Sequence, residues 1–256
     1  DGVAAIVLRI NSGGGSMFAS EIIRQQIVYA RDLGVPIIVS MGAVAASGGY
    51  YIAADADQIW ATPTTVTGSI GVFAAFPTFD ELLDRLGVHT DGLGTTTLAG
   101  SLRPDRPLDP SLKKAIDSGV AFAYQRFLEV VAQGRGMTVQ DVKPVAEGRV
   151  WSAEDARTAG LIDNLGSLDD AVEAAANLAG LEDYRVDFVH LPLSARDLLM
   201  KQLANRLGHL DWSGGMGGKI VLQGLMAPLR EAVGELEALQ DPRHLYMRCL
   251  ACTSVR

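Results

Sequence analysis

The fold class is decided by residues 3–41, which read VAAIVLRINSGGGSMFASEIIRQQIVYARDLGVPIIVSM. Residues 3–10 are a continuous apolar run of strand length, and a glycine-rich turn ends it. Apolar residues then recur at helical spacing over residues 16–33, and residues 35–41 form a second apolar run. Strand, turn, helix and strand make a βαβ unit, which predicts an α/β fold around a parallel sheet with helices on both faces.

The rest of the chain adds shorter elements and changes character after Gly180. We expect helices over 45–54, 79–86, 110–133, 138–146, 152–159 and 168–178, and strands over 58–61, 88–93 and 184–190. Further on, residues 198–207 and 222–239 have the spacing of amphipathic helices. We therefore expect one domain over residues 1–180 and a helical C-terminal extension over residues 181–256 that serves oligomerisation.

Charge and hydropathy exclude several classes of protein. The 256 residues carry 22 basic and 30 acidic side chains, a formal net charge of −8. This balance repels polyphosphates, so we expect no nucleic-acid partner. No apolar run reaches the ~18 residues that a membrane span needs. Because the first strand begins almost at residue 1, we interpret the chain as a piece of a longer protein.

Two glycine-rich turns follow buried strands, at Asn11–Ser16 and Ala46–Gly49. Ligands bind at the carboxyl ends of strands in an open α/β sheet, and N–H groups freed there can stabilise an oxyanion. Ser47 stands at the second turn, where small neighbours let a substrate backbone approach. Two other interpretations stay open: ordinary tight turns, and Ser47 as a helix N-cap. The turn at Asn11–Ser16 matches neither a phosphate loop nor the dinucleotide fingerprint, and we expect no cofactor. Zinc at Cys249 and Cys252 would need two more ligands, of which only His244 is near in sequence, so we expect no metal.

Three ordered segments are more specific than a single serine turn. They are residues 6–16 (IVLRINSGGGS), 45–53 (AASGGYYIA) and 67–72 (TGSIGV). Together they resemble the signal peptide peptidase A family, also called protease IV, and the resemblance reaches residues 241–252 (DPRHLYMRCLAC). The resemblance implies a Clp/crotonase-like α/β fold, a spiral of βαβ units, with residues 1–180 as the peptidase domain.

The resemblance also implies a serine–lysine dyad. Ser47 matches the nucleophile, and Ser69 matches a second serine that holds the lysine amine. Gly48 would donate one oxyanion N–H, and the turn with Gly13 and Gly14 would supply another. A lysine base must be neutral and therefore needs a dry site. We expect four apolar residues to line that site and bind substrate: Val44, Ile70, Val72 and Phe73.

The lysine itself is missing from the place where short family members carry it. Residue 99 is alanine, and residues 94–101 contain no lysine. Long members carry the lysine in the N-terminal half and the serine in the C-terminal half, and this chain resembles the latter. We therefore expect the isolated chain to be folded but inactive, and to need the N-terminal half of its parent as partner. Lys113 and Lys114, on a helix, are the nearest alternatives.

The same resemblance implies the setting of the reaction. The parent would be an endopeptidase that degrades cleaved signal peptides, which are apolar, at the bacterial inner membrane on its periplasmic side. It would assemble as a homotetramer, with the anchor outside this chain.

Three alternatives remain open from the residues. A Clp-type Ser-His-Asp protease would need a histidine near position 72, where this chain has valine, and its histidines are scattered. A crotonase-like acyl-CoA enzyme would need a carboxylate for proton transfer, for which Glu21 is the candidate. A non-catalytic oligomerising scaffold would need no dyad. Cys249 and Cys252 form a Cys-x-x-Cys pair that we interpret as structural, or as a disulfide in an oxidising compartment.

Overall fold

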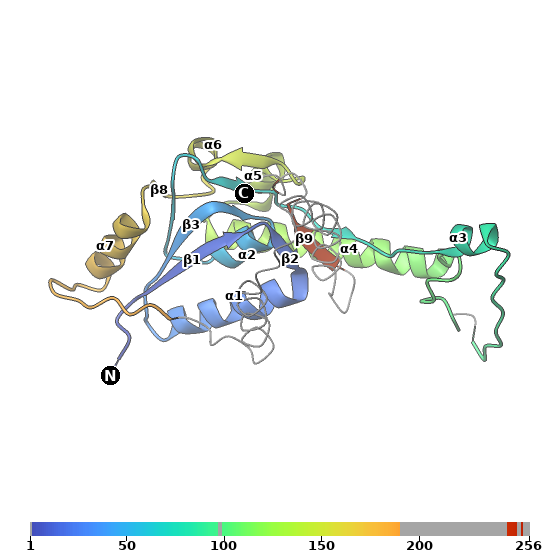
Figure 1. The fold of residues 1–256 in the computed structure, drawn as a ribbon. Helices are drawn as coiled ribbons and strands as arrows, with labels where there is room; N and C mark the ends of the chain where they lie inside the picture. Colours follow the sequence, from blue (N-terminus) through green and yellow to red (C-terminus); the bar gives the residue numbers. More distant parts are fainter. Residues whose placement is uncertain (1, 97–98, 190–244, 250–251, 253–256) are drawn as a thin grey trace, which may run out of the picture. The chain divides into compact units, whose positions relative to one another are not determined.

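Figure 1 shows the chain in a computed structural model, which describes residues 2–96, 99–189, 245–249 and 252. By its internal contacts the chain divides into one unit of Asp1–Glu182 with Ala238–Arg256, and a second unit of Asp183–Glu237. All helices and strands described below belong to the first unit. That unit includes residues 245–252, which our boundary assigns to the extension, because a strand there pairs with strands of the main domain.

The main sheet is built on β3 (Ile37–Ala46), which pairs in parallel with three strands. The strands of the main sheet follow the order β7-β5-β3-β4-β8, and β1 pairs with β3 outside this order. The other strands are β1 (Ile6–Ser12), β4 (Gln58–Ala61), β5 (Val66–Gly68), β7 (Val150–Ser152) and β8 (Asn164–Leu165). Within the described residues, only the β5–β7 pairing of this sheet is antiparallel. The α/β class is therefore confirmed, with a mixed sheet in place of the wholly parallel one expected.

Strand β3 runs five residues beyond the apolar stretch that predicts it. The register between β1 and β3 shifts after Ile10, so that Ser12 lies opposite Ala45. Asn11 sits at this irregularity, and its Oδ1 accepts a hydrogen bond from Val44 N at 3.2 Å. The longer strand carries the chain directly to Ser47.

Most helices begin and end where the sequence indicates. They are α1 (Met17–Asp32), α2 (Gly48–Ala53), α3 (Asp80–Arg85), α4 (Pro110–Gly134), α5 (Val139–Val142) with the 3-10 turn η1 (Lys143–Val145), α6 (Ala153–Thr158) and α7 (Leu168–Leu178). Side chains cap α1, α4 and α7: Ser16, Asp109 and Ser167 accept from backbone N–H groups of the first turn. Ser47 is the N-cap residue of α2, but its side chain makes no capping bond.

A second sheet was not expected from the sequence. It has the order β2-β9-β6, with β2 (Gly14–Ser16), β6 (Phe73–Ala74) and β9 (Leu245–Arg248). Both pairings are antiparallel, with Gly15 opposite Met247 and Phe73 opposite Tyr246. Short local patterns cannot reveal a strand whose partners lie so far away in sequence.

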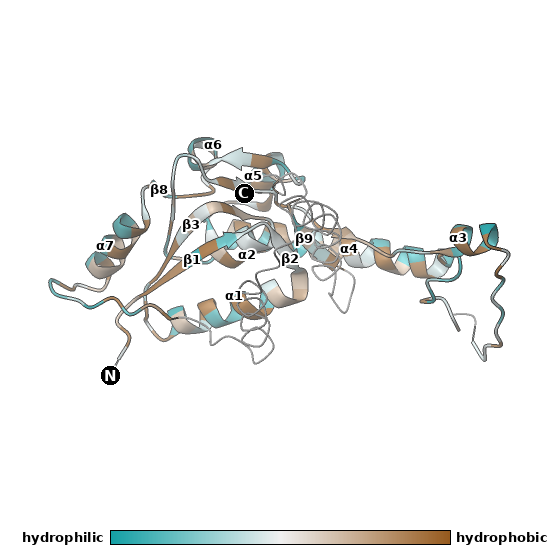
Figure 2. Cartoon of the chain, viewed as in Figure 1, coloured by the Kyte–Doolittle hydropathy of each residue, from teal (hydrophilic) through white to brown (hydrophobic). Residues whose placement is uncertain are grey.

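The core lies on both sides of β3. Ile37, Val39 and Met41 are buried there with Tyr50 of α2 and Phe127 of α4. Figure 2 shows β1 and β3 as largely hydrophobic, whereas α1 and α4 mix hydrophobic and hydrophilic residues. Among the described residues, no helix is both long and apolar enough to cross a membrane.

Two expected strands do not form. Residues 88–93 and the described part of 184–190 have no strand pairing. The amphipathic stretches 198–207 and 222–239 lie outside the described residues.

Candidate active site

Ser47 occupies a strained turn between β3 and α2. Its φ of 53° and ψ of −116° are rare for a residue with a side chain. The backbone N–H donates to Gly68 O at 2.8 Å, and Tyr51 N donates to the Ser47 carbonyl. The residue is fully buried, and its Oγ has no hydrogen-bond partner within the described part of the chain. A buried hydroxyl without a partner costs free energy, which points to a role beyond folding.

The two glycine turns face each other. A Cβ added to Gly14 would lie 2.6 Å from Gly48 N, and one added to Gly48 would lie 3.2 Å from Gly14 Cα. Gly48 is the first residue of α2, so its N–H has no acceptor within the helix. The Gly14 N–H donates to Ser12 Oγ at 3.2 Å, and Gly13 O accepts from Cys249 N at 2.7 Å. The three glycines expected to form an oxyanion site thus lie together beside Ser47.

Ser69 is placed as a counterpart of Ser47. Ala46 and Gly68 lie opposite each other in the parallel β3–β5 pair, so the two serines follow paired residues. Ser69 also has a positive φ, 51°, and its N–H donates to Arg149 O at 2.7 Å. Both serines therefore leave the same edge of the sheet, as the sequence motifs imply.

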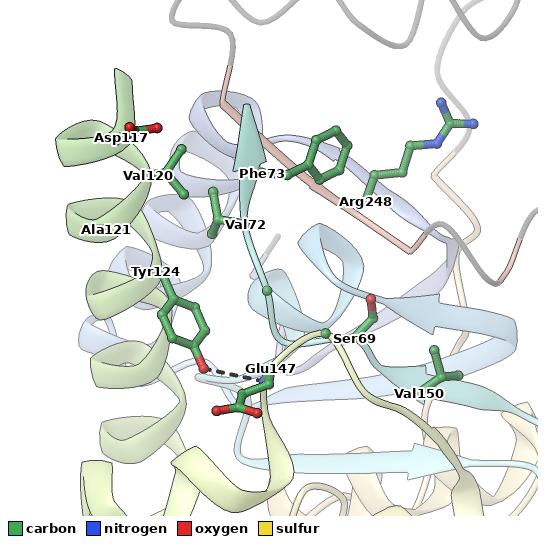
Figure 3. A pocket seen from close by; sticks show the side chains of 12 residues that line it. Ser69, Val72, Phe73, Asp117, Val120, Ala121, Tyr124, Glu147, Val150 and Arg248 are labelled. Carbon is green, nitrogen blue, oxygen red and sulfur yellow. Dashed lines mark hydrogen bonds between the residues drawn. The ribbon is translucent and has the colours of Figure 1, made fainter. Parts of the chain in front are cut away.

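A cavity of about 580 Å³ opens next to Ser69 (Figure 3). Val72 and Phe73 line it, as expected, and Val120 and Tyr124 of α4 form part of the opposite wall. Its other lining residues are Gly71, Asp117, Ala121, Glu147, Gly148, Val150 and Arg248. Figure 3 shows the Tyr124 hydroxyl directed at residue 147, whose backbone N–H donates to it at 3.3 Å.

The other two residues expected to line this cavity lie elsewhere. Ile70 is fully buried in the main core, and Val44 packs with Ala46, Cys249 and Cys252 in a separate cluster. For Val44 the pleat of β3 decides the direction, because neighbouring residues of a strand point to opposite sides. Ile70 lies beyond the end of β5, after the left-handed turn at Ser69, which directs it into the core. Ser47 is also not among the cavity-lining residues.

Lysines near the cavity are exposed. Lys113 pairs with Asp117 at 2.8 Å, and its side chain is 65% exposed. It lies eleven residues before Tyr124 on α4, about 16 Å along the helix axis. Ala99 belongs to the loop between α3 and α4, where its N–H donates to Thr96 O. In Figure 1 this loop lies beyond the N-terminal half of α4 and away from the junction of β3 and α2.

An ion-pair network links α1 to Asp55 and to Tyr51 of α2, the helix that follows Ser47. Arg24 of α1 donates to Asp55 at 2.5 Å and to Glu21 at 2.7 Å, and the Tyr51 hydroxyl donates to Glu21. Burial alone would raise the pKa of Glu21, but the hydrogen bonds from Arg24, Tyr51 and Gln25 outweigh it and lower the pKa to about 2. A carboxylate so firmly ionised is a poor proton shuttle, which argues against the crotonase-like alternative.

Sequence reasoning missed several residues around the site. Tyr124 and Glu147 reach it from α4 and from the turn before β7, and Arg248 reaches it from β9. The resemblance of residues 241–252 to the family indicated that this segment matters, but it did not predict that the segment lies beside the cavity. Cys249 and Cys252 form a disulfide directly after β9. Among the described residues, no cluster of three or more His, Cys, Asp or Glu could hold a metal ion.

Comparison with protein families shows which family the chain belongs to. The model of peptidase family S49 matches residues 29–182, which include Ser47 and Ser69. The chain belongs to peptidase family S49. Among its curated S49 relatives, "Protease 4" of Salmonella typhi is 39% identical over 99% of this chain and 41% of its own length. "Protease 4" of Haemophilus influenzae is 39% identical, with 99% of this chain and 42% of the relative covered.

A shorter S49 relative is the "Putative signal peptide peptidase SppA" of Enterococcus faecium. It is 36% identical over 72% of this chain and 54% of its own length. The chain thus spans about two fifths of the two Protease 4 sequences. A solved structure, a ClpP1 point mutant from Listeria monocytogenes, aligns with a TM-score of 0.44 at 15% identity, covering 66% of this chain and 77% of that one.

Proposed function

We propose that this chain is the nucleophile-bearing part of a serine peptidase with a serine–lysine dyad. One observation carries the proposal: Ser47, in a chain of peptidase family S49, stands at a strained strand–helix turn with its buried Oγ unpaired among the described residues. A hydroxyl held in this way needs a base to become a nucleophile. The described lysines, Lys113, Lys114 and Lys143, are exposed, and we propose that the base is a lysine of the N-terminal half of the parent.

The proposed chemistry combines Ser47 and the glycine turns of this chain with a lysine of the N-terminal half. The neutral lysine amine takes the Ser47 proton as Oγ bonds to the carbonyl carbon of the substrate peptide. Gly48 N–H and the glycine turn beside it stabilise the oxyanion. The lysine ammonium then gives its proton to the leaving amine, and the peptide C–N bond breaks. Water, activated by the same amine, releases the acyl group from Ser47.

Ser69 acts as the residue that positions the amine. Its hydroxyl leaves the same sheet edge as Ser47 and lines the cavity. Donation of its O–H to the amine lone pair favours the neutral lysine that the reaction needs.

The substrates we propose are apolar peptides, including cleaved signal peptides. Val72, Phe73 and Val120 give the cavity an apolar wall suited to such side chains. The relatives named "Protease 4" and "signal peptide peptidase SppA" support the same class. We place the parent at the bacterial inner membrane, facing the periplasm, as a homotetramer; the Cys249–Cys252 disulfide fits an oxidising compartment.

The test uses the full-length parent and a fluorophosphonate probe that labels activated serines. Ser47→Ala should abolish labelling and lower peptidase turnover by several orders of magnitude, with the melting temperature preserved. The isolated chain should fold yet label no faster than that variant. If the isolated chain labels and cleaves as fast as the parent, the divided dyad is wrong, and Lys113, Lys114 or a histidine of this chain must be the base.

A further inference from the structure

We infer that strand β9 occupies the position of an extended peptide substrate, and that a substrate binds by taking its place between β2 and β6. The inference rests on the proposed function, because it describes how the same site is closed and opened.

The first support is the place of β9 in the fold. It is the central strand of β2-β9-β6, and both of its neighbours belong to the site. Strand β2 contains Gly14, and β6 begins four residues after Ser69. Without β9, its neighbours would be two strand spacings apart, about 9.6 Å, which is the gap that one extended peptide fills. Extended peptides commonly bind in this way, by main-chain hydrogen bonds to exposed strand edges.

The second support is a carbonyl group of β9. A Cβ on Gly14 would overlap the Met247 oxygen, and a Cβ on Gly48 would lie 3.0 Å from it. The Met247 carbonyl is therefore held between the two glycine turns that we assign to the oxyanion site. A peptide carbonyl at this position is what a substrate strand would present to Ser47.

The third support is that the site is closed. Ser47 is fully buried, and Tyr246 and Met247 are 1% and 0% exposed. A nucleophile must meet its substrate, so one covering element has to move. Strands β3 and β5 are held by the main sheet and α2 by its core, whereas β9 is held by three pairs with β2, two pairs with β6 and the packing of Met247. Strand β9 lies outside the main sheet and pairs with β2 and β6 alone among the described strands, so it is the covering element that can leave without breaking that sheet.

The side chains of β9 indicate the kind of peptide. The Tyr246 ring packs against Phe73, with ring centroids 5.7 Å apart, and Met247 is buried in the main core. An extended peptide with an aromatic and an adjacent aliphatic residue would reproduce both contacts. The Cys249–Cys252 disulfide and the bond from Cys249 N to Gly13 O hold the end of the strand in place.

Peptide binding to the 256-residue chain provides the first test. The probe is a fluorescein-labelled peptide of sequence Leu-Tyr-Met-Arg, measured by anisotropy. Met247→Pro removes a ladder hydrogen bond from the centre of β9 and should release it. We expect at least tenfold tighter binding to this variant than to the wild type. Val186→Pro, in a segment without strand pairing, is the matched control and should bind like the wild type.

An engineered disulfide that fixes β9 to β6 provides the second test, which remains available if Met247→Pro fails to fold. Ala74 and Leu245 lie opposite each other in the β6–β9 pair, at a spacing that a disulfide can bridge. The background is the full-length parent with Cys249→Ser and Cys252→Ser. When Ala74→Cys and Leu245→Cys are added and oxidised to a disulfide, fluorophosphonate labelling should slow at least tenfold. Reduction of that disulfide should restore the labelling rate. The same background with Ala74→Cys alone should not respond to oxidation.

The outcomes separate the inference from the proposed function. Equal labelling of the locked and reduced forms would overturn the inference and leave the peptidase assignment intact. Tighter peptide binding to the Met247→Pro variant, in a parent that never labels, would support the inference and refute the nucleophile. A folded Met247→Pro variant that binds the peptide no better than the wild type would show that β9 is a permanent part of the sheet.

Discussion

Replacing Gly14 by alanine tests the close contact of Gly14 with the Met247 carbonyl of β9. The φ of Gly14 is +95°, a region that costs a residue with a Cβ about 1–2 kcal/mol. The new Cβ would also overlap the Met247 carbonyl oxygen and lie 2.6 Å from Gly48 N, so the backbone itself must shift. Overpacking of this kind adds about 1–3 kcal/mol. The free energy of unfolding should therefore fall by about 2–5 kcal/mol.

Gly34 offers a matched control for this substitution. Its φ is +80°, but a Cβ there would meet nothing within 4 Å. Gly34→Ala should thus cost only the conformational part, about 1–2 kcal/mol. The difference between the variants isolates the close approach, and it amounts to about 1–3 kcal/mol.

Thermal unfolding of the three proteins, followed by circular dichroism, measures that difference. For a domain of this size, 1 kcal/mol shifts the melting temperature by about 2–4 °C. We expect Gly14→Ala to melt about 2–12 °C below Gly34→Ala. Identical melting temperatures for the two variants would mean that Gly14 and Met247 are not in contact, and the placement of β9 would fail with them.

Two further predictions concern Ser69 and Glu21. Ser69→Ala in the parent should lower kcat/KM by about 10–100-fold. It should also move the rising limb of the pH–rate profile to higher pH, because the neutral lysine loses a hydrogen-bond donor. A profile unchanged in height and position would show that Ser69 does not act on the lysine. The folded-state pKa of Glu21, about 2, is below its ordinary 4.5, so its contribution to stability is complete above pH 4.5 and is lost as the pH falls toward 2. Glu21→Gln should therefore make stability, measured by denaturant unfolding, fall less steeply between pH 4.5 and 2, and an unchanged pH dependence would contradict this prediction.

The local elements of this fold could be predicted because their signals are local. The apolar run before the first glycine turn, the cap at Asp109 followed by Pro110, and the glycine after α7 each fix one end of an element. The neighbourhood of Ser47 and Ser69 also follows from sequence, because both end parallel strands and such ends meet at one edge of a sheet.

The remaining features depend on contacts that no window of sequence contains. The cavity wall formed by Tyr124 requires the long helix α4 to lie against the turn at residue 147. The direction of Val44 depends on the pleat of β3 and on the irregularity at Asn11, and that of Ile70 on the left-handed turn at Ser69. The pairing of β9 with β2 joins Gly15 to Met247, across most of the chain. Motif spacing located the serines, but the tertiary structure decided what surrounds them.

The wide separation of β6 and β9 has a consequence for biosynthesis. Both neighbours of β9 leave the ribosome before it does, and about 170 residues lie between Ala74 and Leu245. At ~5–20 residues per second, translation of that interval takes roughly 10–30 s. During this time the nascent chain exposes two unpaired strand edges beside its glycine turns, a state prone to mispairing and to capture of other extended chains. Efficient production should therefore depend on whatever shields these edges until the last strand arrives, such as a holding chaperone or slower initiation of neighbouring ribosomes.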